Sequence, residues 1–596
     1  MVPPVARTFL IAGAAVLAFL VAPGVAGAAV TIDGYRITGN MPSTGTPVTG
    51  PSSVQAGAHP DAGSFSTFTY PDASEDLKTA LTNFAPGLLG NPESAPKCPE
   101  AALQAGGAAC PAGSKIGTSR LDVVAAGTAF EPAPPFIGDL YNAEPLGNEP
   151  GRLAAVTPIG GGASLVSSIP FHITPRGGGD YGLTGTLTDI NRLPSPPFAA
   201  DLQVRALGFV INGSTNNYVR NPTSCTLHRS TGQAAGYDDP TFVDGPPYVF
   251  GTGGCEQVPF RPTIEMEVGD RGTTRAQGFP PLVVTIRQPT GDSDQRGNKI
   301  TLPVELNTNN TAYTLCSQAQ ADADNCPAES QFGGVTAKSP FLAEELRGPV
   351  YLIQQTATSL PGLLLHLKGR VNVKVQTQTT LVNNRAIQSL VLNAPQLPVS
   401  ELKVALDGGR NTGVFLNRQD LCFRGNSTSR FNDVSGLVKF YGHNGANTDD
   451  LRLKAKVNGC GAGVRGRISR ATRATPLVRL EIDKHPDAPN FKELLIRLSR
   501  NLRLVRSRFQ QGARATEDVD VEYVSRRSLR VTGFPDAGVD DVTVLLRRGA
   551  VRVSQRSRNV LRRGRSRTFR AKVRQTPVTG SATSTRASFR ARGSRR

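Results

Sequence analysis

The segment Leu402-Lys-Val-Ala-Leu406 alternates large apolar side chains with lysine or alanine, and Val371-Asn-Val-Lys-Val375 alternates apolar and polar residues. A period of two residues places successive side chains on opposite faces of a β-strand. Clusters of Gly, Pro, Asn and Asp interrupt such runs at short intervals, as in Pro289-Thr-Gly-Asp-Ser-Asp294. Few windows show the 3.6-residue period of an amphipathic helix. The sequence therefore predicts an all-β protein made of tandem β-sandwich modules.

The composition is that of a folded chain with few aromatic surfaces. Hydrophobic residues make up 38% of the 596 residues and charged residues 19%, which differs from the charge-rich composition of disordered chains. Tryptophan is absent and aromatic residues total 6%. Carbohydrate-binding and base-stacking surfaces depend on exposed aromatic side chains, so the composition argues against both.

Two long segments of the chain resemble each other. Cys110-Pro-Ala-Gly-Ser-Lys-Ile-Gly117 matches Cys326-Pro-Ala-Glu-Ser-Gln-Phe-Gly333, and further along Gly138-Asp-Leu-Tyr141 matches Gly348-Pro-Val-Tyr351. Such matches in the same order indicate an internal duplication. The predicted domains are a signal peptide at 1–28, a first Cys-containing β repeat at 29–258, a second at 259–460 and an Arg-rich basic β domain at 461–596.

The eight cysteines fall into two groups of four with the same short-long-medium spacing. None of the pairs has the spacing of a zinc knuckle, so disulfides are the better interpretation. Three pairings are possible within each group of four. We expect the pairs that close short local loops, each contributing about 3 kcal/mol to stability. These are Cys98–Cys110, Cys225–Cys255, Cys316–Cys326 and Cys422–Cys460.

Several short motifs resemble a family of large secreted actinobacterial proteins of unknown function. The motifs are Ala56-Gly-Ala-His-Pro-Asp61, Ala85-Pro-Gly-Leu-Leu-Gly-Asn-Pro92, Lys97-Cys98 and the segment from Cys110 to Gly117. The resemblance covers most of the chain after residue 28. It implies bacterial export and repeated Cys-paired β modules. It carries no catalytic signature over to this chain.

The first 28 residues have the pattern of a secretory signal peptide. Arg7 precedes an apolar run from Thr8 to Ala22, and Ala26-Gly27-Ala28 supplies small residues for cleavage. An uncleaved membrane anchor is the alternative, but the run is short for a span of roughly 20 residues. We expect a secreted or extracellular protein, associated with the cell surface, without a transmembrane segment after cleavage.

Positive charge is concentrated in the last domain. The chain has a formal net charge of +19, yet residues 461–596 hold 33 Lys or Arg against 11 Asp or Glu. Arginines on solvated strand faces would explain this charge without any ligand. Binding to a polyanion is the functional hypothesis, with an anionic cell-wall polymer or membrane surface as the partner and nucleic acid as the less favoured one. The candidate residues are Arg556, Arg558, Arg562, Arg563, Arg565, Arg567 and Arg570.

The sequence contains no recognisable catalytic, metal or cofactor motif. Ser400-Glu-Leu-Lys403 matches the Ser-x-x-Lys of penicillin-binding enzymes, but it enters an alternating strand, so we expect a coincidence. Asp292-Ser-Asp294 begins like a calcium loop, but Arg296 stands where an oxygen ligand belongs, so we expect a hairpin turn. His485 precedes Pro-Asp, which suits a turn.

These patterns favour a non-enzymatic, structural or adhesive protein of the cell envelope or extracellular space. The alternatives are an extracellular hydrolase whose site is assembled from distant loops, and a secreted protein that binds nucleic acid or another polyanion. A deep cleft with converging polar side chains would favour the hydrolase.

Overall fold

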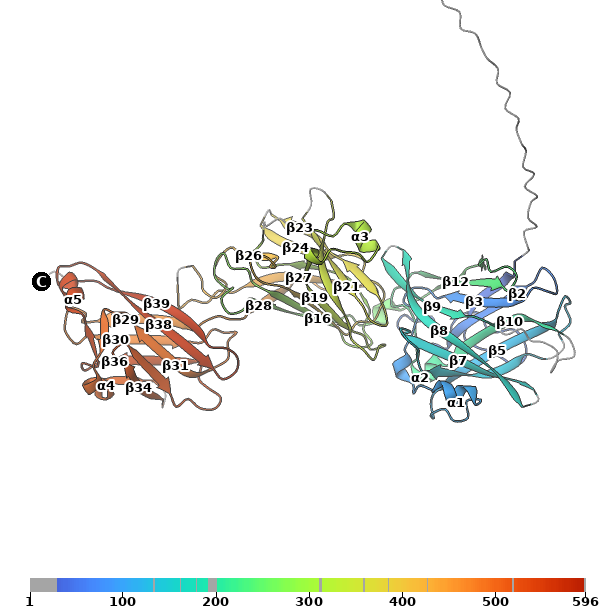
Figure 1. The fold of residues 1–596 in the computed structure, drawn as a ribbon, viewed down its shortest axis with the longest axis horizontal. Helices are drawn as coiled ribbons and strands as arrows, with labels where there is room; N and C mark the ends of the chain where they lie inside the picture. The colour runs from blue at the N-terminus through green and yellow to red at the C-terminus, as the bar shows by residue number, and fades with distance from the viewer. Residues whose placement is uncertain are drawn as a thin grey trace, which may run out of the picture.

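The computed structural model is nearly all β, with 49% of residues in strands and 7% in helices, which confirms the predicted fold class. The predicted signal peptide lies outside the described residues. The structure describes residues 29–131, 134–160, 162–177, 179–190, 201–309, 313–356, 360–383, 385–425, 427–516 and 519–593. Figure 1 shows three groups of strands that follow one another along the long axis of the molecule.

The first group is a curled sheet, here called the first barrel. Its strands lie in the order β1-β2-β10-β5-β6-β7-β8-β9-β3-β12-β13, with β14 paired to β12 and β4 paired to β11 in a small separate sheet. Because β1 also lies against β12, the sheet curls back on itself around an apolar core. Its elements are β1 (Thr31–Thr38), β2 (Ala62–Thr69), β3 (Leu77–Asn83), β4 (Leu89–Gly90), α1 (Glu100–Gln104), β5 (Lys115–Ala125), β6 (Phe136–Ala143), β7 (Gly151–Gly160), β8 (Ala163–Gly177), β9 (Asp180–Leu187), β10 (Leu202–Ile211), α2 (Gly213–Asn216), β11 (Val219–Arg220), β12 (Leu227–Gly236), β13 (Val243–Asp244) and β14 (Tyr248–Gly251).

The second group, the second barrel, is also one curled sheet, in the order β22-β21-β20-β19-β25-β16-β15-β28-β27-β17-β24-β23. Thr377 alone separates β22 from β23, so the chain itself joins the two ends of the sheet. Its elements are β15 (Thr263–Val268), β16 (Leu282–Arg287), β17 (Gln295–Thr301), β18 (Leu306–Thr308), α3 (Gln318–Asp322), β19 (Gln331–Lys338), β20 (Leu346–Ile353), β21 (Gly362–Leu367), β22 (Val373–Gln376), β23 (Gln378–Val382), β24 (Ala386–Val391), β25 (Glu401–Leu406), β26 (Phe415–Asn417), β27 (Ser435–Gly442) and β28 (Leu451–Val457).

The two barrels have closely similar strand orders. The run β1-β2-β10-β5-β6-β7 in the first barrel has the counterpart β15-β16-β25-β19-β20-β21 in the second. A separate two-stranded sheet accompanies each barrel, β4 with β11 and β18 with β26. A short helix follows the first cysteine of each group, α1 after Cys98 and α3 after Cys316.

The third group, the C-terminal sandwich, has two sheets with the orders β29-β30-β36-β33 and β34-β35-β31-β38-β39. Alternate residues of both sheets are fully buried between them, as in Val478, Leu480 and Ile482 of β30. Its elements are β29 (Gly463–Ser469), β30 (Leu477–Asp483), β31 (Phe491–Leu498), β32 (Leu502–Leu504), α4 (Arg506–Gly512), β33 (Ala513–Ala515), β34 (Asp520–Ser525), β35 (Ser528–Thr532), β36 (Asp541–Leu546), β37 (Val551–Val553), α5 (Gln555–Arg562), β38 (Arg567–Pro577) and β39 (Thr583–Ala591).

Candidate functional site

The eight cysteines form the four local disulfides that the sequence predicted, and no free cysteine is present among the described residues. Cys98 and Cys316 have matching surroundings. The Cys98 amide donates to the Asn142 carbonyl at 2.7 Å, and the Cys316 amide donates to the Leu352 carbonyl at 2.9 Å. The Cys98–Cys110 and Cys316–Cys326 disulfides therefore hold α1 beside β6 and α3 beside β20.

The seven arginines predicted as a polyanion site lie on one continuous segment of the C-terminal sandwich. Arg556, Arg558 and Arg562 belong to α5, whose first turn is capped by the Ser554 side chain. Arg563 and Arg565 lie in the following turn, and Arg567 and Arg570 lie on β38. Five of the seven are exposed, whereas Arg558 and Arg567 are half-buried. In Figure 1, α5 lies at the end of the sandwich farthest from the barrels.

Strand pairing extends this positive charge over the outer surface of the five-stranded sheet. Lys572 of β38 lies directly opposite Arg497 of β31 on one side and Arg586 of β39 on the other. Side chains directly opposite each other in an antiparallel sheet have Cβ atoms about 4.5–5.5 Å apart on the same face. The three cations therefore form a row across three strands. We call the exposed cations of β31, β38 and β39 on this surface the cationic face; they are Arg497, Arg570, Lys572, Arg574, Arg586 and Arg590.

Within the described part of the chain, none of the six cations of the cationic face forms an ion pair. The nearest ion pair on the same sheet joins Arg530 to Glu493 at 3.0 Å. Arg590 donates to the Ser566 hydroxyl at 2.8 Å, which is a neutral acceptor. Like charges directly opposite each other destabilise a sheet. The face therefore combines mutual repulsion with unneutralised positive charge.

Sequence reasoning missed most of the cationic face. The predicted run shares only Arg570 with the cationic face, because charge density along the chain identifies only cations that are close in sequence. Arg497 and Arg586 are 89 positions apart in the sequence, and only the pairing of β31, β38 and β39 brings them into one row. The alternation in Phe569-Arg-Ala-Lys-Val573 was the available signal, since it already placed Arg570 and Lys572 on the outer face.

The sequence motifs that resemble catalytic or metal sites have structural roles. Ser400 precedes β25, and its hydroxyl donates to the Lys338 carbonyl at 3.2 Å. Lys403 lies on the exposed side of β25, as expected for a coincidental match. His485 begins a turn in which the Ala488 amide donates to its carbonyl at 2.9 Å, so that prediction is confirmed. No group of three or more His, Cys, Asp or Glu side chains able to hold a metal ion occurs among the described residues.

The expected hairpin turn at Asp292–Asp294 is wrong. This segment joins β16 to β17, and β15, β28 and β27 lie between those two strands in the sheet. Its carboxylates instead bind arginines. Asp292 accepts from Arg261 at 2.7 Å, and Asp294 accepts from Arg220 of the first barrel at 2.8 Å. The segment is therefore a contact between the barrels, which the local spacing of the aspartates did not indicate.

A buried glutamine adds further hydrogen bonds at the same junction. The side-chain oxygen of Gln396 accepts from the backbone amides of Thr223 at 2.8 Å and Ser224 at 3.1 Å. Its own backbone amide donates to the Asp180 carboxylate at 3.2 Å. Gln396 belongs to the second barrel and its three partners to the first, so the two barrels are docked through directional contacts.

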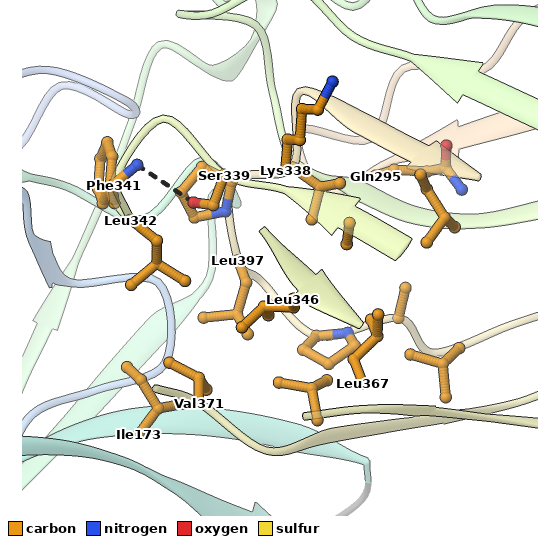
Figure 2. Close-up of a pocket in the computed structure, with 18 of the residues that line it drawn as sticks. Ile173, Gln295, Lys338, Ser339, Phe341, Leu342, Leu346, Leu367, Val371 and Leu397 are labelled. Carbon is orange, nitrogen blue, oxygen red and sulfur yellow. Dashed lines mark hydrogen bonds between the residues drawn. The ribbon is translucent and has the colours of Figure 1, made fainter. Parts of the chain in front are cut away.

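A cavity of about 280 Å³ occupies the interior of the second barrel and continues across this junction. Alternate residues of four strands line its walls with branched apolar side chains. Figure 2 shows Leu346, Leu367, Val371 and Leu397 around the cavity, with Ile173 of the first barrel at its edge. The alternating wall residues are Leu282, Val284 and Ile286 of β16, Leu402, Val404 and Leu406 of β25, Leu363, Leu365 and Leu367 of β21, and Val373 and Val375 of β22.

The polar residues that line the cavity gather mainly at one end of the barrel. Gln288 follows β16, Gln295 begins β17, and Lys338 ends β19. The Gln288 amide donates to the Ser400 carbonyl at 3.0 Å, which fixes these strand ends beside one another. The Lys338 ammonium points away from the apolar walls in Figure 2 and pairs with Glu401 at 3.0 Å. The cavity is thus an apolar chamber with a polar rim.

Comparison with known proteins adds no assignment to these sites. No protein-family model matches this chain, and no curated protein is similar enough in sequence to count as a relative. Within the described residues, no helix has the length and apolar character needed to cross a membrane.

Proposed function

We propose that this chain is an exported, non-enzymatic protein of the cell envelope or extracellular space, with a structural or adhesive role. In this proposal the C-terminal sandwich binds anionic envelope polymers, and the two barrels are copies of one duplicated unit. The matching strand orders support the duplication. Four disulfides support export, because disulfides persist in oxidising compartments. The predicted signal peptide and the resemblance to secreted actinobacterial proteins agree with it.

The observation that carries the binding proposal is the row Arg497–Lys572–Arg586. Neighbouring strands are about 4.8 Å apart, and outward residues of one strand are about 7 Å apart, so the face presents a grid of closely spaced cations. A polymer with a phosphate or carboxylate on every unit places several anions over such a grid at once. Arginine forks bind these groups through two parallel hydrogen bonds, which suits a face composed mainly of arginine.

Binding also removes the repulsion that the face carries when it is free. Each opposing pair of cations destabilises the sheet, and an anion between them reverses the sign of that interaction. The predicted arginines that precede Arg570, including Arg556, Arg558 and Arg562 of α5, continue the positive charge toward the end of the sandwich. A long polymer therefore has a path along the sheet and over α5.

The test compares two triple variants of the full chain. The first replaces Arg497, Lys572 and Arg586 with glutamine. The control replaces Arg467, Arg473 and Arg503, which are exposed cations of the same domain outside the cationic face, with glutamine. Both variants lose three positive charges, so a difference between them reports the arrangement of the charges.

Long-chain inorganic polyphosphate and a purified cell-wall fraction are the probes, with binding measured between about 50 and 500 mM salt. The first variant should bind at least tenfold more weakly, and its logarithmic salt dependence should be shallower by up to about three ions. The control variant should lose far less affinity for both probes. Equal losses of affinity in both variants would show that only net charge matters and would reject the cationic face as a specific site. Tighter binding to single-stranded DNA than to polyphosphate would favour the nucleic-acid alternative.

A further inference from the structure

We infer that the cavity of the second barrel is a binding site for a single unbranched alkyl chain, as carried by a fatty acid or another single-chain amphiphile. Its walls are alternate residues of four strands that all present branched aliphatic side chains. Several of these, including Val284, Leu363 and Val404, are only half-buried although they face the interior. Side chains that point into a barrel yet stay accessible show that the barrel is incompletely filled by its own residues.

The size of the cavity selects the class of ligand. A methylene group takes about the same space as a water molecule, about 30 Å³, so 280 Å³ holds about nine such units. Water is a poor occupant, because an ordered water needs two to four polar partners and apolar cavities stay dry. Eight-stranded and larger β-barrels have interiors wide enough to hold a small ligand. A linear chain of about nine or ten carbons matches both the volume and the lining.

The polar rim gives the chain a direction. Gln288, Gln295 and Lys338 lie at the end of the second barrel that faces the first barrel, where polar side chains can hydrogen-bond the head of an amphiphile. Leu282 and Leu406, which face each other across β16 and β25, lie at the opposite end of those strands. The chain therefore enters with its methyl end first and leaves its head at the rim. Because Lys338 is already paired with Glu401, the rim offers no free charge to select an anionic head.

The first barrel also contributes residues to the wall of the cavity. Phe84, Phe171 and Phe209 of the first barrel also line the cavity, with ring centroids 6.3 and 6.4 Å from Phe84 to the other two. These aromatic rings therefore extend the apolar lining beyond the second barrel. This inference rests on the cavity alone and is independent of the cationic face.

The experiment titrates the full chain, after removal of bound lipid, with straight-chain carboxylates of 6 to 16 carbons and with 1-decanol. Saturable one-to-one binding is expected, with affinity rising about fourfold per added methylene up to about ten carbons and then levelling off. Decanoate and 1-decanol should bind within a few-fold of each other. Absence of binding, affinity that does not change with chain length, or a strong preference for the carboxylate would overturn the inference.

Matched variants locate the site. Val404→Phe fills the cavity and should weaken decanoate binding at least tenfold, while Val283→Phe, which lies on the other face of β16 from Val284, should leave it unchanged. Leu363→Ala enlarges the cavity, so the chain length at which affinity levels off should increase. This second variant keeps the inference testable if the Val404→Phe variant does not fold. Equal loss in the Val404→Phe and Val283→Phe variants would place the ligand elsewhere.

Discussion

The guanidinium of Arg220 lies 2.8 Å from the carboxylate of Asp294, and both side chains are almost completely buried, with 6% and 3% of their surface exposed. The two residues belong to different barrels. Arg220 also donates to the Asp292 carbonyl at 2.9 Å. A buried ion pair stabilises only while both partners stay hydrogen-bonded, because each charge alone is costly to bury. Loss of either partner would therefore leave an uncompensated charge buried at the junction of the barrels.

Replacement of Arg220 by methionine should destabilise the docked barrels by about 3–5 kcal/mol, because it leaves the Asp294 carboxylate buried without its partner. The double variant Arg220→Met/Asp294→Leu should recover most of that loss. Arg287→Met, which breaks exposed ion pairs with Glu265 and Glu401, should cost far less, because solvent screens exposed ion pairs. Urea denaturation followed by circular dichroism measures all three. If Arg220→Met lowers the free energy of unfolding as little as Arg287→Met does, the buried ion pair does not stabilise the docking of the two barrels.

The disulfides should differ in their contribution to stability. In the chain-entropy account, a bridge stabilises more when it closes a longer loop. Cys422–Cys460 closes 38 residues and Cys316–Cys326 closes 10, so replacing each pair by serines should cost about 4 and about 3 kcal/mol respectively. The denaturation midpoints of the two double variants test this order. A larger loss for the shorter loop would show that native packing around Cys316 outweighs the entropy of the unfolded chain.

The sequence was sufficient for the strand content and the disulfides because both are local. Alternation in segments such as Leu402–Leu406 needs no partner strand to be recognised, and β25 spans Glu401–Leu406. Each cysteine pairs with its neighbour in the chain, so sequence spacing and the short local loop agreed. The predicted turn at His485 was local in the same sense.

The cavity and the cationic face were not predictable, because both depend on which strands become neighbours. The row of Arg497, Lys572 and Arg586 exists only in the register of three strands from separate segments. The hairpin expected at Asp292–Asp294 failed for the same reason, since β17 pairs with distant strands and not with β16. An interior cavity needs the volume enclosed by a whole sheet, which no single segment specifies.

Acid should destabilise the protein between about pH 7 and 5.5. Burial is the main cause that lowers the pKa of His228, His366, His443 and His485 below the ordinary value. A histidine whose pKa is lower in the folded state than in the unfolded state stabilises fully above the unfolded pKa, about 6.5. That contribution is lost as the pH falls toward the folded pKa, at up to about 1.4 kcal/mol per pH unit for each group.

His443 is the most informative of these histidines. Its pKa is lowered by burial and by Arg296, while Asp294 and Asp180 act in the opposite direction. The variant His443→Gln removes its titration and should flatten the fall in stability between pH 7 and 5.5, as measured by urea midpoints at half-unit steps. Carboxylates with a lowered pKa, such as Asp324, lose their contribution to stability only at lower pH, so they do not affect the measurement between pH 7 and 5.5. Stability that stays constant or rises on acidification would contradict the assignment of neutral buried histidines.

Lys572→Glu should change stability and binding in opposite directions. The new carboxylate would stand directly opposite Arg497 and Arg586, so two repulsive pairs become attractive ones. Each cross-strand pair of opposite charge contributes about 0.2–1 kcal/mol, and the gain should disappear near 1 M salt, where charges are screened over about 3 Å. The same variant should bind polyphosphate more weakly, because it places a negative charge in the centre of the cationic face. Lys403→Glu is the control, since Thr285 and Thr336 stand opposite Lys403, so it should bring no gain in stability and no loss of binding. If Lys572→Glu lowers stability at low salt, the cations of the face do not repel one another as its geometry requires.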